Sequence, residues 1–219
     1  LYRNPVAKNG ACPPTYQGGT GSHVIYNIKL KTYIRDTLLT EVNRHGSPPL
    51  WLRPLAVVAS WFGFHGVGQT NCMSCATAVA DTLKTGNLHT ALTDLRGGSP
   101  DRFATFDNVS RTLFDSAGEL ADKLRKSGDI NAVVTVERPG WRRLFSPVSG
   151  HACNIIKAGD TLHLVDAQKK RHVTVDQTQG KAAIHKALLQ FLGPVATISR
   201  AISLGNIGFF PSPPIERQD

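Results

Sequence analysis

The residues best suited to chemistry lie in Gln69–Cys75, which reads Gln-Thr-Asn-Cys-Met-Ser-Cys and leads into a helical run at 76–84. A glycine-rich loop precedes this segment, and Asn71 is a residue type that caps helix N-termini. Cys72 is therefore predicted to lie in the first turn of a helix. The N–H groups and partial positive charge at that end of a helix favour a thiolate over a thiol. A thiolate is the form that a nucleophilic cysteine needs.

Two later segments carry the side chains that such a cysteine needs as partners. His151 lies within Gly-His-Ala-Cys-Asn, and Asp166 lies within Leu-Val-Asp-Ala-Gln. In a hydrolase of this kind the histidine stabilises the thiolate and then protonates the departing nitrogen, while the carboxylate orients the imidazole. Cys72, His151 and Asp166 are therefore the predicted catalytic residues.

The spacing between His151 and Asp166 fits a β-hairpin. Residues 151–156 and 161–165 have strand patterns, and Lys157-Ala158-Gly159-Asp160 between them has turn composition. A two-residue turn at 158–159, or a four-residue turn at 157–160, places His151 directly opposite Asp166. Opposed side chains lie about 4.5–5.5 Å apart at Cβ. A three-residue turn would shift the register by one residue and separate the pair.

The surrounding patterns predict one α+β domain. Helical periodicity covers 24–43, 52–61, 72–84, 116–126 and 181–192, and strand patterns cover 130–136, 151–156, 161–165, 173–175 and 196–203. Residues 1–22 are expected to form an extended or poorly ordered arm, and 23–219 a single catalytic domain. A proline-rich tail is expected at 211–214.

Charge and cysteine content limit the partners and the compartment. The net charge of +9 favours acidic partners. The basic residues are dispersed, with 142–143 and 169–171 the densest groups, and no nucleic-acid recognition motif accompanies them, so nucleic acid is not an expected partner. No apolar run approaches the roughly 18 residues of a transmembrane helix. The four cysteines are expected to be mostly free thiols in a reducing compartment.

Zinc binding is the main competitor to catalysis. Cys72-x-x-Cys75 together with His151-x-Cys153 offers a Cys₃His ligand set. His151 and Cys153 would share one face of a strand. A structural zinc site usually lies in a turn rather than at the start of a helix of small residues, so no metal and no cofactor is expected. The ligand set still defines a second class of function, a non-enzymatic binding module stapled by zinc.

At these residues the sequence resembles the papain-fold toxin family, bacterial effector domains related to protein glutamine deamidases. The matching segments are 70–78 with the helix through Gly86, then 150–154, then 164–168. The resemblance implies a papain-like α+β fold, with the nucleophile at a helix N-terminus packed on an antiparallel sheet, and a Cys-His-Asp triad. It also implies delivery as the C-terminal part of a larger secreted or injected polypeptide, which agrees with a first residue other than Met.

Related families differ in which cysteine they would make the nucleophile. In papain-like proteases a glutamine lies six residues before it, and Gln69 and Cys75 have that spacing. In families with an Asn-Cys-x-x-x-Ala helix start, such as the ovarian-tumour-type deubiquitinases, the matching residue is Cys72. The two cysteines lie about 60° apart around a helix, so either could face His151. Cys72 is favoured because it is nearer the helix end. The helix N–H groups, with Gln69 or Gln168, are candidates for an oxyanion or orienting role.

The expected function is that of a bacterial toxin or effector that hydrolyses the side-chain amide of a glutamine on a target protein. It would act in the cytoplasm of the target cell. A cysteine protease or deubiquitinase would use the same triad. The expected partners are the protein that bears the reactive glutamine and, given the charge of +9, an acidic immunity or inhibitor protein.

Overall fold

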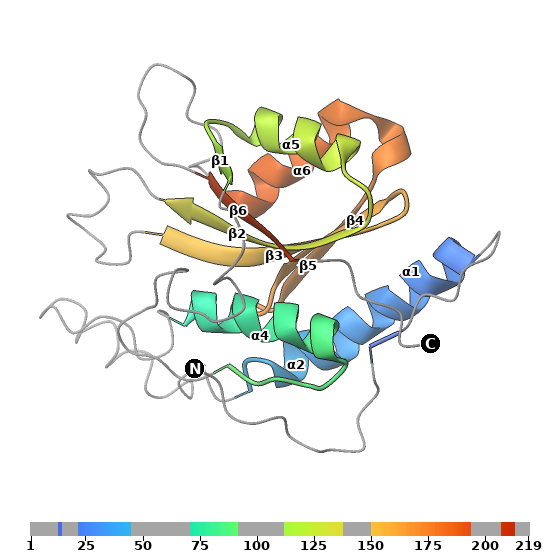
Figure 1. Ribbon diagram of the computed structural model, residues 1–219, viewed down its shortest axis with the longest axis vertical. Helices are drawn as coiled ribbons and strands as arrows, with labels where there is room; N and C mark the ends of the chain where they lie inside the picture. The colour runs from blue at the N-terminus through green and yellow to red at the C-terminus, as the bar shows by residue number, and fades with distance from the viewer. Residues whose placement is uncertain are drawn as a thin grey trace, which may run out of the picture.

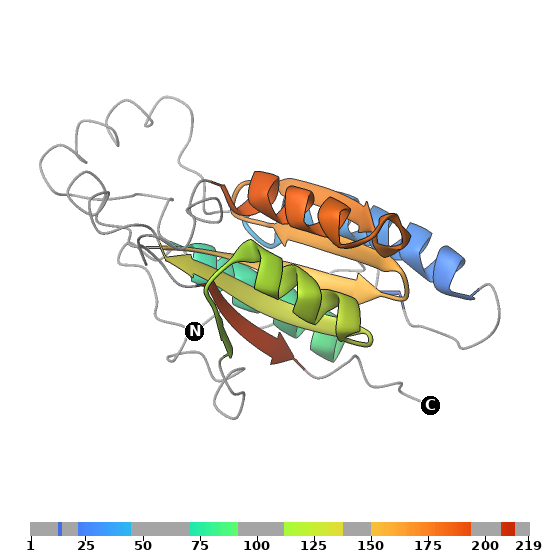
Figure 2. The same ribbon diagram turned by 90° about the horizontal axis from the view of Figure 1, so that it is seen from above.

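An antiparallel sheet between two layers of helix forms the centre of the molecule (Figure 1). The computed structural model describes residues 13–14, 22–44, 71–91, 112–137, 150–193 and 207–212. The sheet has six strands in the order β1-β6-β2-β3-β4-β5. Helices α5 and α6 cover one face and lie side by side along it (Figure 2), whereas α4, α1 and α2 cover the other. This is the α+β arrangement that the sequence predicts.

Most elements lie where the sequence patterns indicate them. The strands are β1 (Thr112–Phe114), β2 (Ile130–Glu137), β3 (Gly150–Ala158), β4 (Thr161–Asp166), β5 (Arg171–Asp176) and β6 (Ile207–Ser212). The helices are α1 (Ser22–Tyr33), which continues through a π-helical turn (Ile34–Leu38) into α2 (Leu39–Glu41), then α4 (Cys72–Thr85), α5 (Ala117–Lys126) and α6 (Lys181–Leu192). Among the described helices, none is long and apolar enough to cross a membrane.

The prediction of a proline-rich tail is wrong for residues 211 and 212, because they belong to β6. Strand β6 pairs with β2 along its length, and Pro211 lies opposite Ala132. Proline lacks the N–H that a strand residue donates, so composition alone argues against a strand here. The predicted helix at 52–61, the predicted strand at 196–203 and nearly all of the predicted arm lie outside the described residues.

Alternate residues of the central strands supply two apolar cores. Ile155 and Leu164 pack beneath α5 and α6, and their chain neighbours Ile156 and Val165 pack beneath α4 and α1. This alternation follows from the period of two along a strand. Because the sheet is packed against helices on both faces, its strands cannot shift relative to those helices. The side chains at the ends of the strands are therefore held in fixed positions.

Two buried asparagines of the sheet attach α4 to it. Asn154 donates from Nδ2 to the carbonyl of Ala76 at 2.8 Å, and Asn131 donates from Nδ2 to the carbonyl of Ala80 at 3.3 Å. Buried polar groups are costly unless they are paired, so these bonds select one depth and one rotation of α4 on the sheet. The position of Cys72, the first residue of α4, is set in the same way.

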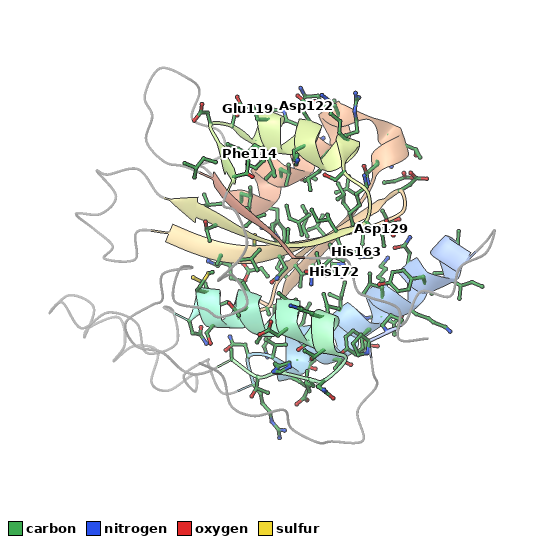
Figure 3. All side chains as sticks on the ribbon, in the orientation of Figure 1. Phe114, Glu119, Asp122, Asp129, His163 and His172 are labelled. Atoms are coloured by element: carbon green, nitrogen blue, oxygen red, sulfur yellow. The ribbon has the colours of Figure 1, made fainter. Side chains whose placement is uncertain are left out.

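A pair of histidines, His163 buried and His172 partly buried, joins α1 to the sheet on the same face (Figure 3). His163 of β4 stacks on His172 of β5, with ring centroids 5.3 Å apart and Nδ1 of His163 3.1 Å from Nε2 of His172. His163 Nε2 lies 3.2 Å from Oδ1 of Asn27, which can only accept, so Nε2 donates and Nδ1 accepts from His172. Burial, together with the opposite histidine and Lys31, lowers the pKa of His163 to about 3. Burial, with nearby Lys31 and Arg35, lowers the pKa of His172 to about 4.

Candidate active site

Cys72 is the first residue of α4, as predicted, but Asn71 does not cap the helix with its side chain. The first backbone bond of the helix runs from the N–H of Cys75 to the carbonyl of Asn71, at 2.9 Å. The backbone of Asn71 (φ −90°, ψ 17°) is not in the extended conformation from which an N-cap side chain reaches the first turn. Asn71 therefore occupies the predicted N-cap position, but its side chain does not cap the helix.

The side chain of Asn71 belongs instead to a cluster of three amides, Asn43, Asn71 and Gln168, which we call the amide clamp. Asn71 Nδ2 donates to Oδ1 of Asn43 at 2.9 Å, and Gln168 Nε2 donates to Oδ1 of Asn71 at 3.2 Å. Asn43 Nδ2 in turn donates to the carbonyl of Gln168, at 3.4 Å. The clamp ties together the end of the N-terminal helix, the start of α4 and the turn between β4 and β5.

The clamp contains two residues that the sequence singled out, Asn71 and Gln168, and one that it did not. Gln168 was a candidate for an oxyanion or orienting role, and its amide nitrogen holds Asn71. Asn43, which is 1% exposed, was not anticipated, because nothing in the helical pattern of 24–43 distinguishes it. Gln69, the other glutamine considered, lies outside the described residues.

His151 and Asp166 form a short hydrogen bond. The distance between His151 Nε2 and Asp166 Oδ2 is 2.6 Å, and the two side chains are 13% and 5% exposed. Asp166 also accepts from the backbone N–H of Lys169 through Oδ1, at 2.9 Å. A carboxylate held from both sides keeps the imidazole in one orientation.

The hairpin that brings this pair together has a different register from the one predicted. Its turn consists of Gly159 and Asp160, with Gly159 at φ 56°, rather than residues 158–159 or 157–160. The pairing runs from Ala158–Thr161 to Asn154–Val165 and is offset by two positions from the predicted one. His151 is thus not directly opposite Asp166. An offset of two keeps both side chains on the same face, and a diagonal neighbour remains within reach of a long side chain.

The side chain of Cys72 interacts with His151 and is one of the causes that raise the pKa of the histidine. Because Nε2 is bonded to Asp166, Nδ1 is the ring nitrogen left to face the sulfur. Burial by itself would lower the pKa of His151, but the hydrogen bond to Asp166 and the interaction with Cys72 outweigh it and raise the pKa to about 8. The imidazolium is therefore the main form of His151 at neutral pH, and a cationic partner of this kind stabilises a thiolate.

Asp166 provides the opposite charge. Burial would raise the pKa of Asp166, but the hydrogen bond from His151 and the bond from the N–H of Lys169 hold it below the ordinary value. The site thus contains a carboxylate, an imidazolium and a thiol in sequence. The structure brings the three predicted residues together, and their catalytic role stays a prediction.

The other two described cysteines lie in a different environment. Cys75 is 1% exposed, and burial, followed by the neighbouring Cys72, raises its pKa far above the ordinary value. Burial also raises the pKa of Cys153. Cys72, Cys75 and Cys153 are free thiols, as expected. In the part of the chain that the structure describes, no group of three or more His, Cys, Asp or Glu side chains is arranged to hold a metal ion, so the Cys₃His alternative gains no support.

A cysteine at the start of a helix, packed on an antiparallel sheet that presents a histidine and a carboxylate to it, is the arrangement of the papain-like class of folds. Residues 70–171, which include Cys72, His151 and Asp166, match the family model of papain fold toxin 1, glutamine deamidase. This match confirms both the resemblance inferred from the sequence and the papain-like α+β fold. No curated protein and no solved structure gives a significant match.

Proposed function

We propose that this chain is a bacterial toxin domain that converts a glutamine of a target protein to glutamate. The observation that carries the proposal is the series Cys72–His151–Asp166, in which His151 is hydrogen-bonded to Asp166 and interacts with Cys72. The series lies within the segment that matches a glutamine deamidase family. The series has the order of roles that amide hydrolysis by a thiol requires.

Each residue has a defined part in the reaction. The Cys72 thiolate attacks the side-chain carbonyl carbon of glutamine and forms a tetrahedral intermediate. His151, as the imidazolium, gives its Nδ1 proton to the departing nitrogen, so that ammonia leaves and a thioester remains. His151, now neutral, takes a proton from water, which attacks the thioester and releases glutamate and the thiol. Asp166 keeps the imidazole oriented throughout, and its negative charge favours the protonated ring.

The start of α4 supports the negative oxygen of the tetrahedral intermediate. The first N–H groups of a helix point along its axis and have no partner within the helix. The amide clamp holds the side chain of Asn71 away from the cap position, so it does not compete with a substrate oxygen there. Gln168 contributes to this geometry by orienting Asn71, and the oxyanion lies at the backbone of Cys72.

Cys72 is the proposed nucleophile in preference to Cys75. His151 interacts with Cys72, whereas burial of the Cys75 thiol raises its pKa and opposes ionisation. Replacement of either thiol by alanine changes few atoms, which makes Cys75→Ala a matched control for Cys72→Ala.

Intact-mass analysis of candidate target proteins tests the proposal. After incubation with the purified chain, a target should gain one mass unit for each glutamine deamidated, and Cys72→Ala should leave its mass unchanged. Cys75→Ala should retain the activity. Fragments of the target in place of the mass gain would make the enzyme a cysteine protease or deubiquitinase with the same triad, and would contradict deamidation.

The charge of the chain bears on its further partners. With a net charge of +9, we expect an acidic immunity or inhibitor protein, and we expect the enzyme to act in the cytoplasm of a target cell after secretion or injection. Co-expression with candidate inhibitors tests the electrostatic part of this idea. A neutral or basic protein that binds tightly and blocks deamidation would contradict it.

A further inference from the structure

The turn between β4 and β5, residues 167–170, borders the candidate active site and carries exposed positive charge. Lys169 and Lys170 are both exposed, and Arg171 follows as the first residue of β5. Lys169 Nζ lies 3.9 Å from Oδ2 of Asp166, the oxygen that binds His151. By way of Asp166 and His151, the path from the Lys169 ammonium to the Cys72 sulfur is on the order of 10 Å, about three residues of extended chain.

The turn at 167–170 is held rigidly to the rest of the site by hydrogen bonds. The N–H of Lys169 donates to Oδ1 of Asp166, and both the side chain and the carbonyl of Gln168 belong to the amide clamp. At its far end, Arg171 donates to the carbonyl of Gln190 at 3.2 Å, and its guanidinium lies 5.1 Å from the ring centroid of Phe191. Arg171 is thus engaged with α6, whereas the two lysines carry the charge that a ligand can meet.

The backbone of Lys170 is a second, independent observation. It has φ 52°, in the left-handed region that non-glycine residues seldom adopt. Glycine or asparagine would occupy this position at lower conformational cost. A lysine with a long cationic side chain stands at a place where backbone conformation alone favours another residue, and such departures from local preference are concentrated at functional sites.

We propose that the turn at 167–170 is a subsite for an acidic residue of the target protein, within about three positions of the glutamine that reacts. This inference rests on the proposed function, because it places the glutamine at Cys72. The carboxylate of Asp166, which lies beside Lys169, is already bonded to His151 and to the N–H of Lys169. An acidic side chain of the substrate would therefore meet Lys169 and Lys170, whose charges exceed the single charge of Asp166.

Binding to an inactive enzyme tests the subsite without any chemical step. The full chain with Cys72→Ala is titrated into fluorescein-labelled peptides that share a central glutamine and carry aspartate, alanine or lysine three positions away on each side. The aspartate peptide should bind about three- to fivefold more tightly than the alanine peptide for each cation engaged, as for exposed ion pairs. The lysine peptide should bind most weakly, and the difference should shrink between 50 and 500 mM salt.

Charge reversal within the turn supplies the specific control. Lys170→Glu in the Cys72→Ala background should abolish or invert the preference for aspartate. Lys29→Glu makes the same change in net charge at an exposed position of α1, outside the turn, and should leave the preference unchanged. Equal binding of the three peptides would overturn the proposal, and so would an equal effect of the two reversals.

Turnover of the same peptides by the enzyme with Cys72 intact separates this inference from the proposed function. An aspartate preference in binding without any ammonia release would retain the subsite and refute deamidation. Ammonia release at equal kcat/KM from all three peptides would support deamidation and refute the subsite. If both hold, the preference should appear mainly in KM, because the turn does not touch the reacting amide.

Discussion

Asp166→Asn should remove the main cause of the raised pKa of His151. The pKa of about 8 lies roughly 1.5 units above the ordinary value of 6.5, which corresponds to about 2 kcal/mol of preference for the imidazolium. Burial opposes that preference, so without the carboxylate charge the pKa of His151 should fall to 6.5 or below. At pH 7.5 the protonated fraction would drop from about three quarters to about one tenth. Deamidation at this pH should then slow by at least about eightfold.

The same change has a consequence for stability. A histidine whose pKa is raised in the folded state stabilises it below the unfolded pKa, and the stabilisation is lost as the pH rises through the folded pKa. The free energy of unfolding of the wild type should therefore decrease by about 2 kcal/mol between pH 6.5 and somewhat above 8 on account of His151. Asp166→Asn should lack this component.

Nuclear magnetic resonance titration of the histidine ring protons measures the effect directly, with a His151→Gln variant to assign the signal. Asp160→Asn removes the same charge from the exposed turn between β3 and β4 and should leave the titration of His151 in place. A His151 signal that titrates at the same pH in the wild type and in Asp166→Asn would refute the electrostatic reasoning.

Three further predictions concern the thiols, the amide clamp and the histidine pair. Cys72→Ala should abolish deamidation with the circular dichroism spectrum unchanged, and Cys75→Ala should keep most of it; the opposite result would reassign the nucleophile. Asn43→Ala should lower the free energy of unfolding by about 1–3 kcal/mol, since it leaves buried amide groups unpaired, and should lower kcat more than it changes KM; loss of stability alone would reduce the clamp to a structural role. Because the folded pKa values of His163 and His172 lie below the unfolded value, stability should decrease as the pH falls from 6.5 toward 4, by up to about 1.4 kcal/mol per pH unit for each histidine. Urea denaturation at pH 7, 6 and 5 measures this, His172→Gln should show about half the slope, and a flat profile would contradict it.

The helices could be predicted from the sequence because each has a strong local signal. Helix α5 begins after Ser116, whose hydroxyl accepts from the N–H of Glu119, which is the pattern of a capping box. Helix α4 ends at Gly86, which adopts the left-handed conformation of a C-terminal cap. Both signals lie within a few residues of the helix end and do not depend on the rest of the fold.

Features set by long-range contacts could not be predicted in the same way. Asn71 has the residue type of a cap, yet Asn43 and Gln168, both distant in the sequence, take its side chain. Strand β6 contains Pro211, which local preference assigns to a tail, and its pairing with the distant strand β2, where Pro211 lies opposite Ala132, includes it in the sheet.

The placement of His151 relative to Asp166 could be predicted in part: the shared face follows from a local pattern, whereas the register does not. Strand alternation correctly placed both residues on one face, because either turn considered, and the turn observed, keeps the same parity. The register itself depended on whether Gly159 is the first or the second residue of the turn. Composition does not decide that point, and the hairpin uses Gly159 as the first.

In the proposed reaction the Cys72 sulfur forms a thioester with the side chain of a glutamine. Acid quenching during turnover of a glutamine peptide, followed by mass analysis of the protein digest, detects this intermediate. An adduct should appear on the fragment that contains Cys72, with the mass of the whole peptide less one ammonia. An adduct on another cysteine, or one with the mass of a cleaved peptide, would contradict the proposed reaction.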